Sequence, residues 1–536
     1  MIERLGPGIA AASLAVAACS ASPPMTPAVP EPPPKIAPMP TVDLPPQRFA
    51  TAPPGTTPST VVRPTKEQVL AAAPDLDGLL KQALGKLGVV GLSAAVVLGR
   101  ERIWAGSYGT RDRDGGEPID VDTVFRIGSL TKLFTGLAIL KLRDAGKLGL
   151  DDPVARHLPE IEQVRYPTTD SPRITIRHLV THTSGLPRLG KLDYFSRKEA
   201  VTEPELLAGL KDLSLEAPPG EAEAYSNLGM SLAGLVVSRV SRQPYRDYVT
   251  EQLLEPLGMG ASVWDQEAVP PDRLASGYRS ENDSYRAGHH WRMGASEACG
   301  GMYSSAADMA RFVGSQLDAW PARSDPPSGP VRRSSIRESH LLAGPGPSGA
   351  RSFGINWGSI SHPKLGFAAT HAGGTLQYGA TVWLLPERGL GLVLLANGGG
   401  EAGEVAERLS GVGGRMLDLI LKQVPVPELT LSPALAAAAT KVRALLAAPE
   451  TDAIEQLFNE AFLKQFPPKR ITKLLTQSAD ALGACTGHTP LQQSDAKTGV
   501  VRLDCELGTA EVVLVLESPT AAQLAGFAIR AVEPHD

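Results

Sequence analysis

The stretch from Gly128 to Gly146 reads GSLTKLFTGLAILKLRDAG and combines a candidate nucleophile with a helix signal. Its apolar residues recur at the period of an amphipathic helix, which Gly146 is expected to end. Ser129 and Lys132 are three residues apart, so a helix would turn their side chains to one face. Ser129 would lie in the first turn, where unpaired backbone N–H groups favour developing negative charge.

A serine hydroxyl is a weak nucleophile unless a base within hydrogen-bond reach takes its proton. Lysine is ordinarily protonated at neutral pH, so it can act as that base only where burial or neighbouring cations disfavour its charge. The apolar neighbours Leu133 and Phe134 are compatible with burial of Lys132. The sequence therefore indicates a serine activated by a lysine.

The same serine–lysine spacing recurs at residues 361–364 and 494–497. Pro363 interrupts any helix in the first of these segments and pushes the residue before it toward extended geometry. The second segment is a polar turn ahead of a strand-like run. We interpret both as chance matches, and Ser129 as the nucleophile.

Two further triplets follow the serine in chain order, Tyr225-Ser226-Asn227 and His371-Ala372-Gly373. With them, and with the segments 174–186 and 300–309, residues 67–424 resemble the serine β-lactamase and penicillin-binding-protein superfamily. The most similar branch contains class C enzymes, D-alanyl-D-alanine carboxypeptidases and esterases. Five ordered matches over this length make the resemblance specific.

The resemblance implies a role for each motif. Ser129 would form an acyl-enzyme, Lys132 and Tyr225 would relay its proton, and Asn227 would hydrogen-bond the substrate or Lys132. The strand with His371 and Gly373 would hold the substrate. The oxyanion would lie between the backbone N–H groups of Ser129 and Gly374, and such donors typically contribute about 3–4 kcal/mol each.

The third motif departs from the pattern of relatives that bind β-lactams or peptidoglycan peptides, which commonly have Lys-Thr-Gly there. Ala372 has no hydroxyl, and an imidazole such as that of His371 is mostly neutral above about pH 6.5. We therefore expect substrates less anionic than β-lactams. If His371 faces a substrate carboxylate, the preference for anionic substrates should rise as the pH falls through about 6.5.

The chain divides into four predicted parts. Residues 1–18 resemble a lipoprotein signal peptide, with Cys19 as the lipidation site, although a plain secretory signal is the alternative. Residues 19–66 are rich in proline and predict an extended tether. Residues 67–424 form the catalytic region, and residues 433–536 predict a small α+β domain, weakly similar to cystatin/NTF2-like domains.

The pattern of elements predicts an α+β fold. Helical and alternating segments open the catalytic region, helical stretches follow Ser129, and strand-like runs return at 379–385 and 390–396. We expect an antiparallel sheet flanked by helices with an inserted all-helical lobe, as in the β-lactamase/transpeptidase fold. The site would lie at the junction of sheet and lobe.

Cysteine usage and charge limit the remaining possibilities. Export permits a disulfide between Cys485 and Cys505, which flank strand-like segments about 20 residues apart. His178 and His182 have the spacing of a zinc pair, but Leu179 stands where a glutamate is expected. We predict no metal and no cofactor. The net charge of −5 shows no basic stripe, so nucleic acid is not an expected partner.

These observations predict an exported serine hydrolase (EC 3) that cleaves an amide or ester of a small-molecule or peptide substrate. We expect a lipid at Cys19 to anchor it in the bacterial cell envelope, on the outer membrane. The alternative is a non-catalytic lipoprotein that binds penicillin or cell-wall peptide. The retained Ser129, Lys132 and Tyr225 favour the enzyme.

Overall fold

The computed structural model describes residues 62–191, 199–281, 284–287, 292–326, 329–341, 352–362, 365–398, 404–424, 431–493, 497–521 and 523–532. Cys19, the predicted signal peptide and nearly all of the predicted tether lie outside these residues. Within the described residues, no helix has the length and apolar character needed to cross a bilayer.

The catalytic region begins with two helices and a hairpin. The helix α1 (Lys66–Ala71) starts at Thr65, whose side chain accepts the Gln68 N–H, and α2 (Ala73–Leu87) ends at Gly88 in the left-handed conformation. Next come β1 (Gly91–Leu98) and β2 (Glu101–Gly109). The last residue of the predicted tether therefore belongs to α1.

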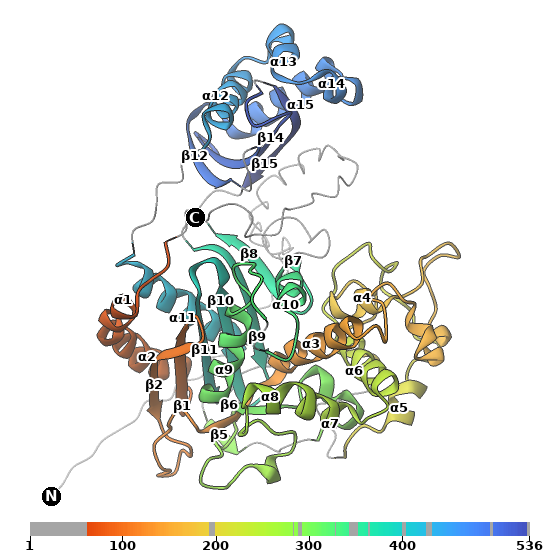
Figure 1. Cartoon of the computed structure of the whole chain (residues 1–536), viewed down its shortest axis with the longest axis vertical. Coiled ribbons are helices and arrows are strands. Elements are labelled where there is room, and N and C mark those ends of the chain that lie inside the picture. Colours follow the sequence, from red (N-terminus) through yellow and green to blue (C-terminus); the bar gives the residue numbers. More distant parts are fainter. Residues whose placement is uncertain are drawn as a thin grey trace, which may run out of the picture. The chain divides into compact units, whose positions relative to one another are not determined.

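A seven-stranded antiparallel sheet organises this region, in the order β2-β1-β11-β10-β9-β8-β7. The late strands are β7 (Ser352–Phe353), β8 (Gly358–His362), β9 (Gly366–Gly374), β10 (Tyr378–Leu385) and β11 (Leu390–Asn397). The first strand pairs with the last, from Gly91 opposite Asn397 to Leu98 opposite Leu390. Figure 1 shows these distant segments side by side.

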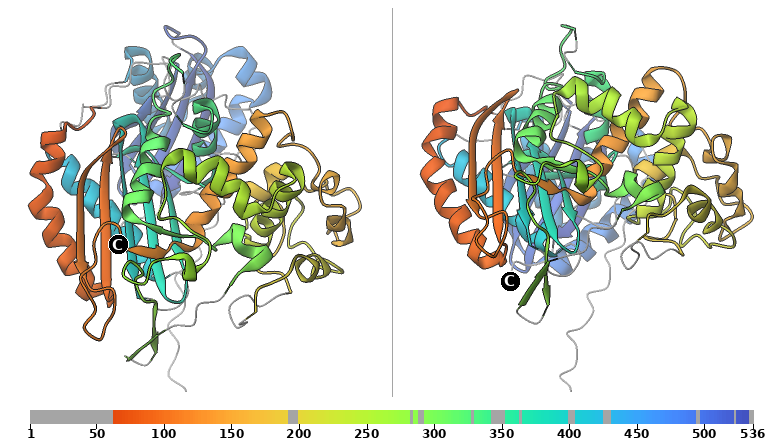
Figure 2. Two further views of the ribbon diagram at one scale, coloured as in Figure 1. Left: turned by 60° about the horizontal axis from the view of Figure 1, so that its bottom comes forward. Right: turned by 90° about the horizontal axis from the view of Figure 1, so that it is seen from below.

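Both faces of the sheet are buried, which explains the nearly continuous apolar sequence of its central strands. Along β1, Leu92, Ala94 and Val96 pack in one cluster with α1, α2 and α11 (Glu404–Leu421). Ala95 and Val97 point to the opposite face and join the core formed with α3 (Thr131–Asp144) and α9 (Ala306–Leu317). Figure 2 shows helices on both sides of the sheet.

The helical lobe lies between β3 (Val124–Arg126) and β6 (Tyr303–Ser305), which pair with each other. Its helices are α4 (Ile176–Val180), α5 (Glu203–Ala208), α6 (Asn227–Ser241), α7 (Tyr245–Val249) and α8 (Glu255–Leu257). A small hairpin, β4 (Tyr278–Glu281) and β5 (Ser284–Ala287), follows them, and α10 (Arg333–His340) precedes β7. The predicted antiparallel sheet with an inserted helical lobe is confirmed.

The last hundred residues contain four helices followed by four strands. The helices are α12 (Pro433–Ala447), α13 (Thr451–Leu457), α14 (Glu460–Gln465) and α15 (Pro468–Leu482). The strands β12 (Cys485–Gln493), β13 (Thr498–Cys505), β14 (Gly508–Leu516) and β15 (Leu524–Val532) form an antiparallel sheet in chain order. α13 and α14 are separate helices, because the side chain of Asn459 accepts the Phe462 N–H and starts α14 two residues after α13 ends.

Candidate active site

The candidate nucleophile, Ser129, lies in a tight turn at the start of α3. Ser129 belongs to a 3₁₀ turn, Gly128–Leu130, and the α-helix itself begins at Thr131. Thr131 closes the turn by donating its hydroxyl to the Gly128 carbonyl at 2.7 Å. The serine therefore lies one turn before the helix rather than within its first turn, and it remains partly exposed.

Lys132 shares the face of Ser129 that the spacing predicts. Its Nζ lies 3.0 Å from Ser129 Oγ and 2.5 Å from the carbonyl oxygen of Cys299. The side chain is fully buried. The amine therefore contacts two groups, the Cys299 carbonyl shortly before β6 and the hydroxyl of Ser129.

Tyr225 lies beside this pair. Lys132 Nζ is 4.8 Å from the centroid of its ring, and the imidazole of His182 stacks on the ring at a centroid distance of 4.4 Å. Tyr225 is partly exposed. Tyr225, which comes from a distant segment of the chain, is therefore brought beside Ser129 and Lys132.

Ser226 fixes the segment that carries Tyr225. Its hydroxyl accepts the Gly229 N–H and so caps α6, and it donates to the Pro187 carbonyl at 2.9 Å. Its own N–H donates to Nδ1 of His182 at 3.2 Å. The tyrosine is thus held by a helix cap on one side and a stacked imidazole on the other.

Asn227 opens α6 and is 8% exposed. Among the described residues, no hydrogen bond joins its side chain to Lys132, whose Nζ contacts Ser129 and Cys299 instead. Of the two expected roles, contact with substrate is the one that remains open to Asn227.

Strand β9 approaches the nucleophile turn through its two glycines. A Cβ on Gly373 would lie 2.0 Å from the Ile127 carbonyl oxygen, so no other residue fits without displacing the turn. A Cβ on Gly128, whose φ is +54°, would meet the backbone of Gly374 at 3.2–3.3 Å. The backbone of Gly374 therefore lies against the turn that holds Ser129.

His371 lies in the site, although its ionisation differs from the sequence-based expectation. Nδ1 lies 2.8 Å from the Ala372 carbonyl oxygen, which can only accept, so Nδ1 carries the proton. Burial of the ring, with a smaller contribution from the Lys132 charge, lowers the pKa of His371 to about 3. The expected change in its charge near pH 6.5 is therefore wrong, because the side chain is only 6% exposed.

Three other side chains complete the surroundings, and sequence reasoning did not identify them as site residues. Phe353 lies 5.2 Å from His182 and 6.2 Å from His371, centroid to centroid. Burial lowers the pKa of His182 well below its usual value, so this ring is neutral too. The guanidinium carbon of Arg188 lies 5.4 Å from the centroid of Tyr225.

The remaining predicted residues lie away from this cluster. Cys485 and Cys505 are joined by a disulfide between β12 and β13. His178 accepts the Thr175 N–H within a helix cap rather than facing His182 as a ligand pair. Within the described residues, no group of three or more histidine, cysteine or acidic side chains could hold a metal ion.

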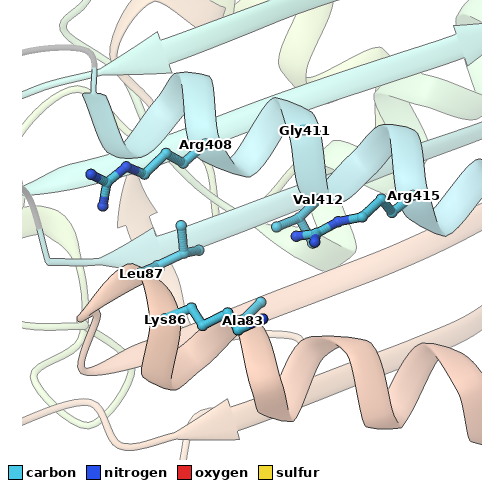
Figure 3. Close-up of a pocket in the computed structure, with 7 residues that line it drawn as sticks. All are labelled: Ala83, Lys86, Leu87, Arg408, Gly411, Val412 and Arg415. Carbon is cyan, nitrogen blue, oxygen red and sulfur yellow. The ribbon is translucent and has the colours of Figure 1, made fainter. Parts of the chain in front are cut away.

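A separate cavity of about 320 Å³ lies between α2 and α11. Figure 3 shows its lining side chains, and none is a catalytic candidate: Ala83, Lys86, Leu87, Arg408, Gly411, Val412 and Arg415. Arg408 is already paired with Glu404 of its own helix. The hollow belongs to the packing of two helices on one face of the sheet.

The chain is similar in sequence to known proteins over part of its length. The chain is 32% identical over 246 residues to Beta-lactamase-like protein 2 of Dictyostelium discoideum, covering 45% of this chain and 44% of that protein. It is 31% identical over 332 residues to human Putative beta-lactamase-like 1, covering 60% of this chain and 64% of that protein. The chain thus spans about half to two thirds of these relatives.

A solved structure shows the same fold. The octameric penicillin-binding protein homologue from Pyrococcus abyssi has a TM-score of 0.56 and 22% identity, covering 83% of this chain and 91% of that one. A model of the Beta-lactamase family matches residues 76–412, more than half of the sequence. The chain therefore belongs to the Beta-lactamase family.

Proposed function

We propose that this chain is a serine hydrolase that forms an acyl-enzyme through Ser129. The observation that carries the proposal is the 3.0 Å contact between Ser129 Oγ and the Nζ of the fully buried Lys132. A nucleophile and a base within hydrogen-bond reach, with the base oriented by a third group, are the parts that covalent catalysis needs. Here the Cys299 carbonyl orients the amine.

The proposed reaction has two halves. Ser129 Oγ attacks a carbonyl carbon while its proton passes to Lys132, and Tyr225 delivers a proton to the departing oxygen or nitrogen. Water then attacks the acyl-enzyme through the same relay and releases the acid. Backbone N–H groups at Ser129 and Gly374 are the proposed donors to the oxyanion, a role supported by the close approach of β9 to the turn.

We propose an ester or amide as the substrate. The side chains of β9 argue against strong β-lactam hydrolysis, because His371 is neutral and Ala372 lacks a hydroxyl. Hydrogen bonds from lysine and threonine at those positions would otherwise hold a carboxylate. A non-catalytic module that binds cell-wall peptide is the competing function.

Covalent labelling tests the proposal. The chain and its Ser129→Ala variant are treated with a fluorophosphonate probe, and turnover of p-nitrophenyl butyrate is measured for both. We expect labelling and turnover to depend on Ser129. Ser361→Ala is the matched control, because Ser361 has the same spacing to a lysine but lies in β8. Labelling that persists in Ser129→Ala contradicts the proposal, and peptide binding without any labelling supports the competing module.

A further inference from the structure

A hydrogen bond joins the edge of the large sheet to the segment that leads to the second motif. Phe353 is the last residue of β7, the two-residue strand at the edge of the sheet, and it pairs with Gly358 of β8. Its backbone N–H donates to Oε2 of Glu223 at 3.0 Å. One carboxylate thus joins two segments that are 130 residues apart, the edge strand and the segment just before Tyr225.

The carboxylate of Glu223 is half-buried and forms no ion pair with the described part of the chain. By contrast, Glu297 of the same lobe is bound by Arg246. Burial raises the pKa of Glu223, while the hydrogen bond from Phe353 acts in the opposite direction. A buried carboxylate is costly unless it is hydrogen-bonded, so the N–H of Phe353 offsets the cost of placing Glu223 there.

The ring of Phe353 packs against the side chains that support Tyr225. It lies edge-on to His182 at a centroid distance of 5.2 Å, and it lies 6.1 Å from the ring of Tyr225. His182 stacks on Tyr225, and its backbone has the left-handed conformation, with a φ of 58°. Few residues other than glycine adopt this conformation, so the packing around His182 must hold it there. Phe353 belongs to that packing, and its own position is fixed by Glu223.

We propose that Glu223 is a positioning residue for proton transfer by Tyr225, and that it acts through Phe353. The inference rests on the proposed function, in which Tyr225 delivers a proton to the leaving group. Proton transfer requires the donor and the acceptor to be placed accurately. Loss of the hydrogen bond should therefore lower kcat, whereas KM should change little because every group proposed to contact the substrate is retained.

Two substitutions of Glu223 in the full chain test this. Glu223→Gln keeps an oxygen that can accept the Phe353 N–H, whereas Glu223→Met keeps the length of the side chain and removes the acceptor. Turnover of p-nitrophenyl butyrate is measured, and the concentration of active enzyme is determined by titration with the fluorophosphonate probe. Glu221→Met is the matched control, because Glu221 is exposed and lies two residues before Glu223.

We expect Glu223→Met to lower kcat by about 10- to 100-fold and to change KM by less than about 2-fold. Glu223→Gln should keep kcat within about 3-fold, because the hydrogen bond is retained. Glu221→Met should keep kcat within about 2-fold, as is usual for an exposed side chain. In a Phe353→Ala background, Glu223→Met should lower kcat by less than about 2-fold, since the ring through which it acts is absent.

An unchanged kcat in Glu223→Met overturns the inference. So does an equal fall in Glu223→Gln or in Glu221→Met, because the acceptor for the Phe353 N–H is kept in both. A fall of the same size in the Phe353→Ala background also overturns it, because a general loss of folded protein would appear in both backgrounds. Failure of the proposed function is distinguishable, because in that case Ser129→Ala would still hydrolyse the ester, whatever the effect of Glu223→Met.

Discussion

The ionisation of His371 gives a quantitative prediction about stability. In the folded chain its pKa is lowered to about 3, mainly by burial, whereas an unfolded histidine titrates near 6.5. Below about pH 6.5 the unfolded chain binds a proton that the folded chain does not. This contribution to stability is therefore intact above pH 6.5 and is lost as the pH falls from there toward 3.

The loss of stability at a given pH depends on how far that pH lies below the pKa of the unfolded histidine. At pH 5 the pH is about 1.5 units below the pKa of the unfolded histidine, and each unit of this difference changes the free energy of unfolding by about 1.4 kcal/mol. His371 should thus lower the free energy of unfolding by about 2 kcal/mol between pH 7.5 and pH 5. His182 and His340 are also buried with lowered pKa values, so they add losses of their own.

The measurement compares the chain with His371→Gln, which keeps a polar side chain that does not titrate. Urea unfolding is followed by tryptophan fluorescence at pH 7.5 and pH 5.0. All six tryptophans lie between positions 104 and 383, so the signal reports on the catalytic region. The losses from His182 and His340 occur in both proteins and cancel in the comparison. Equal losses of stability in the two proteins would refute the reasoning, because His371 would then titrate alike folded and unfolded.

Two further substitutions test the site. Tyr225→Phe keeps the ring that stacks on His182 and removes only the hydroxyl. Turnover should therefore fall by about 10²–10⁴-fold, while Tm changes by less than about 2 °C. Near-normal turnover would exclude the tyrosine from the proton relay. Gly373→Ala places a Cβ 2.0 Å from the Ile127 carbonyl oxygen, so we expect about 1–3 kcal/mol of destabilisation and a large loss of turnover. Gly411→Ala in α11, where a Cβ meets nothing within 4 Å, should keep both, and a similar loss there would show that the close approach is not the cause.

The sequence predicts those features that depend on local spacing. Ser129 and Lys132 share a face because they are three residues apart, whether the serine lies in an α-helix or in the observed 3₁₀ turn. The strands at both ends of the catalytic region are recognisable because apolar residues fill β1, β10 and β11 almost without interruption. The antiparallel pairing of β10 with β11 then follows from the short connection between these two strands.

Features that depend on long-range packing could not be predicted in the same way. His182, Tyr225 and Phe353 form one aromatic cluster, although more than 100 residues separate the last two. The sequence marks His182 only by its spacing to His178 and its place in the segment 174–186, and nothing local shows that its ring supports the tyrosine. The neutral state of His371 likewise depends on burial, which only the packed sheet and lobe create.

Within the third motif, the residue whose backbone contacts the turn of Ser129 differs from the residues whose side chains could recognise a substrate. Gly373 on β9 and Gly128 in the turn are required by the close contact between the strand and the turn that holds Ser129, and this requirement does not depend on the substrate. The close contact with the turn involves neither His371 nor Ala372, so a neutral ring and a methyl group at these positions are compatible with the turn. A site can therefore keep its means of forming an acyl-enzyme while losing an anion receptor on β9.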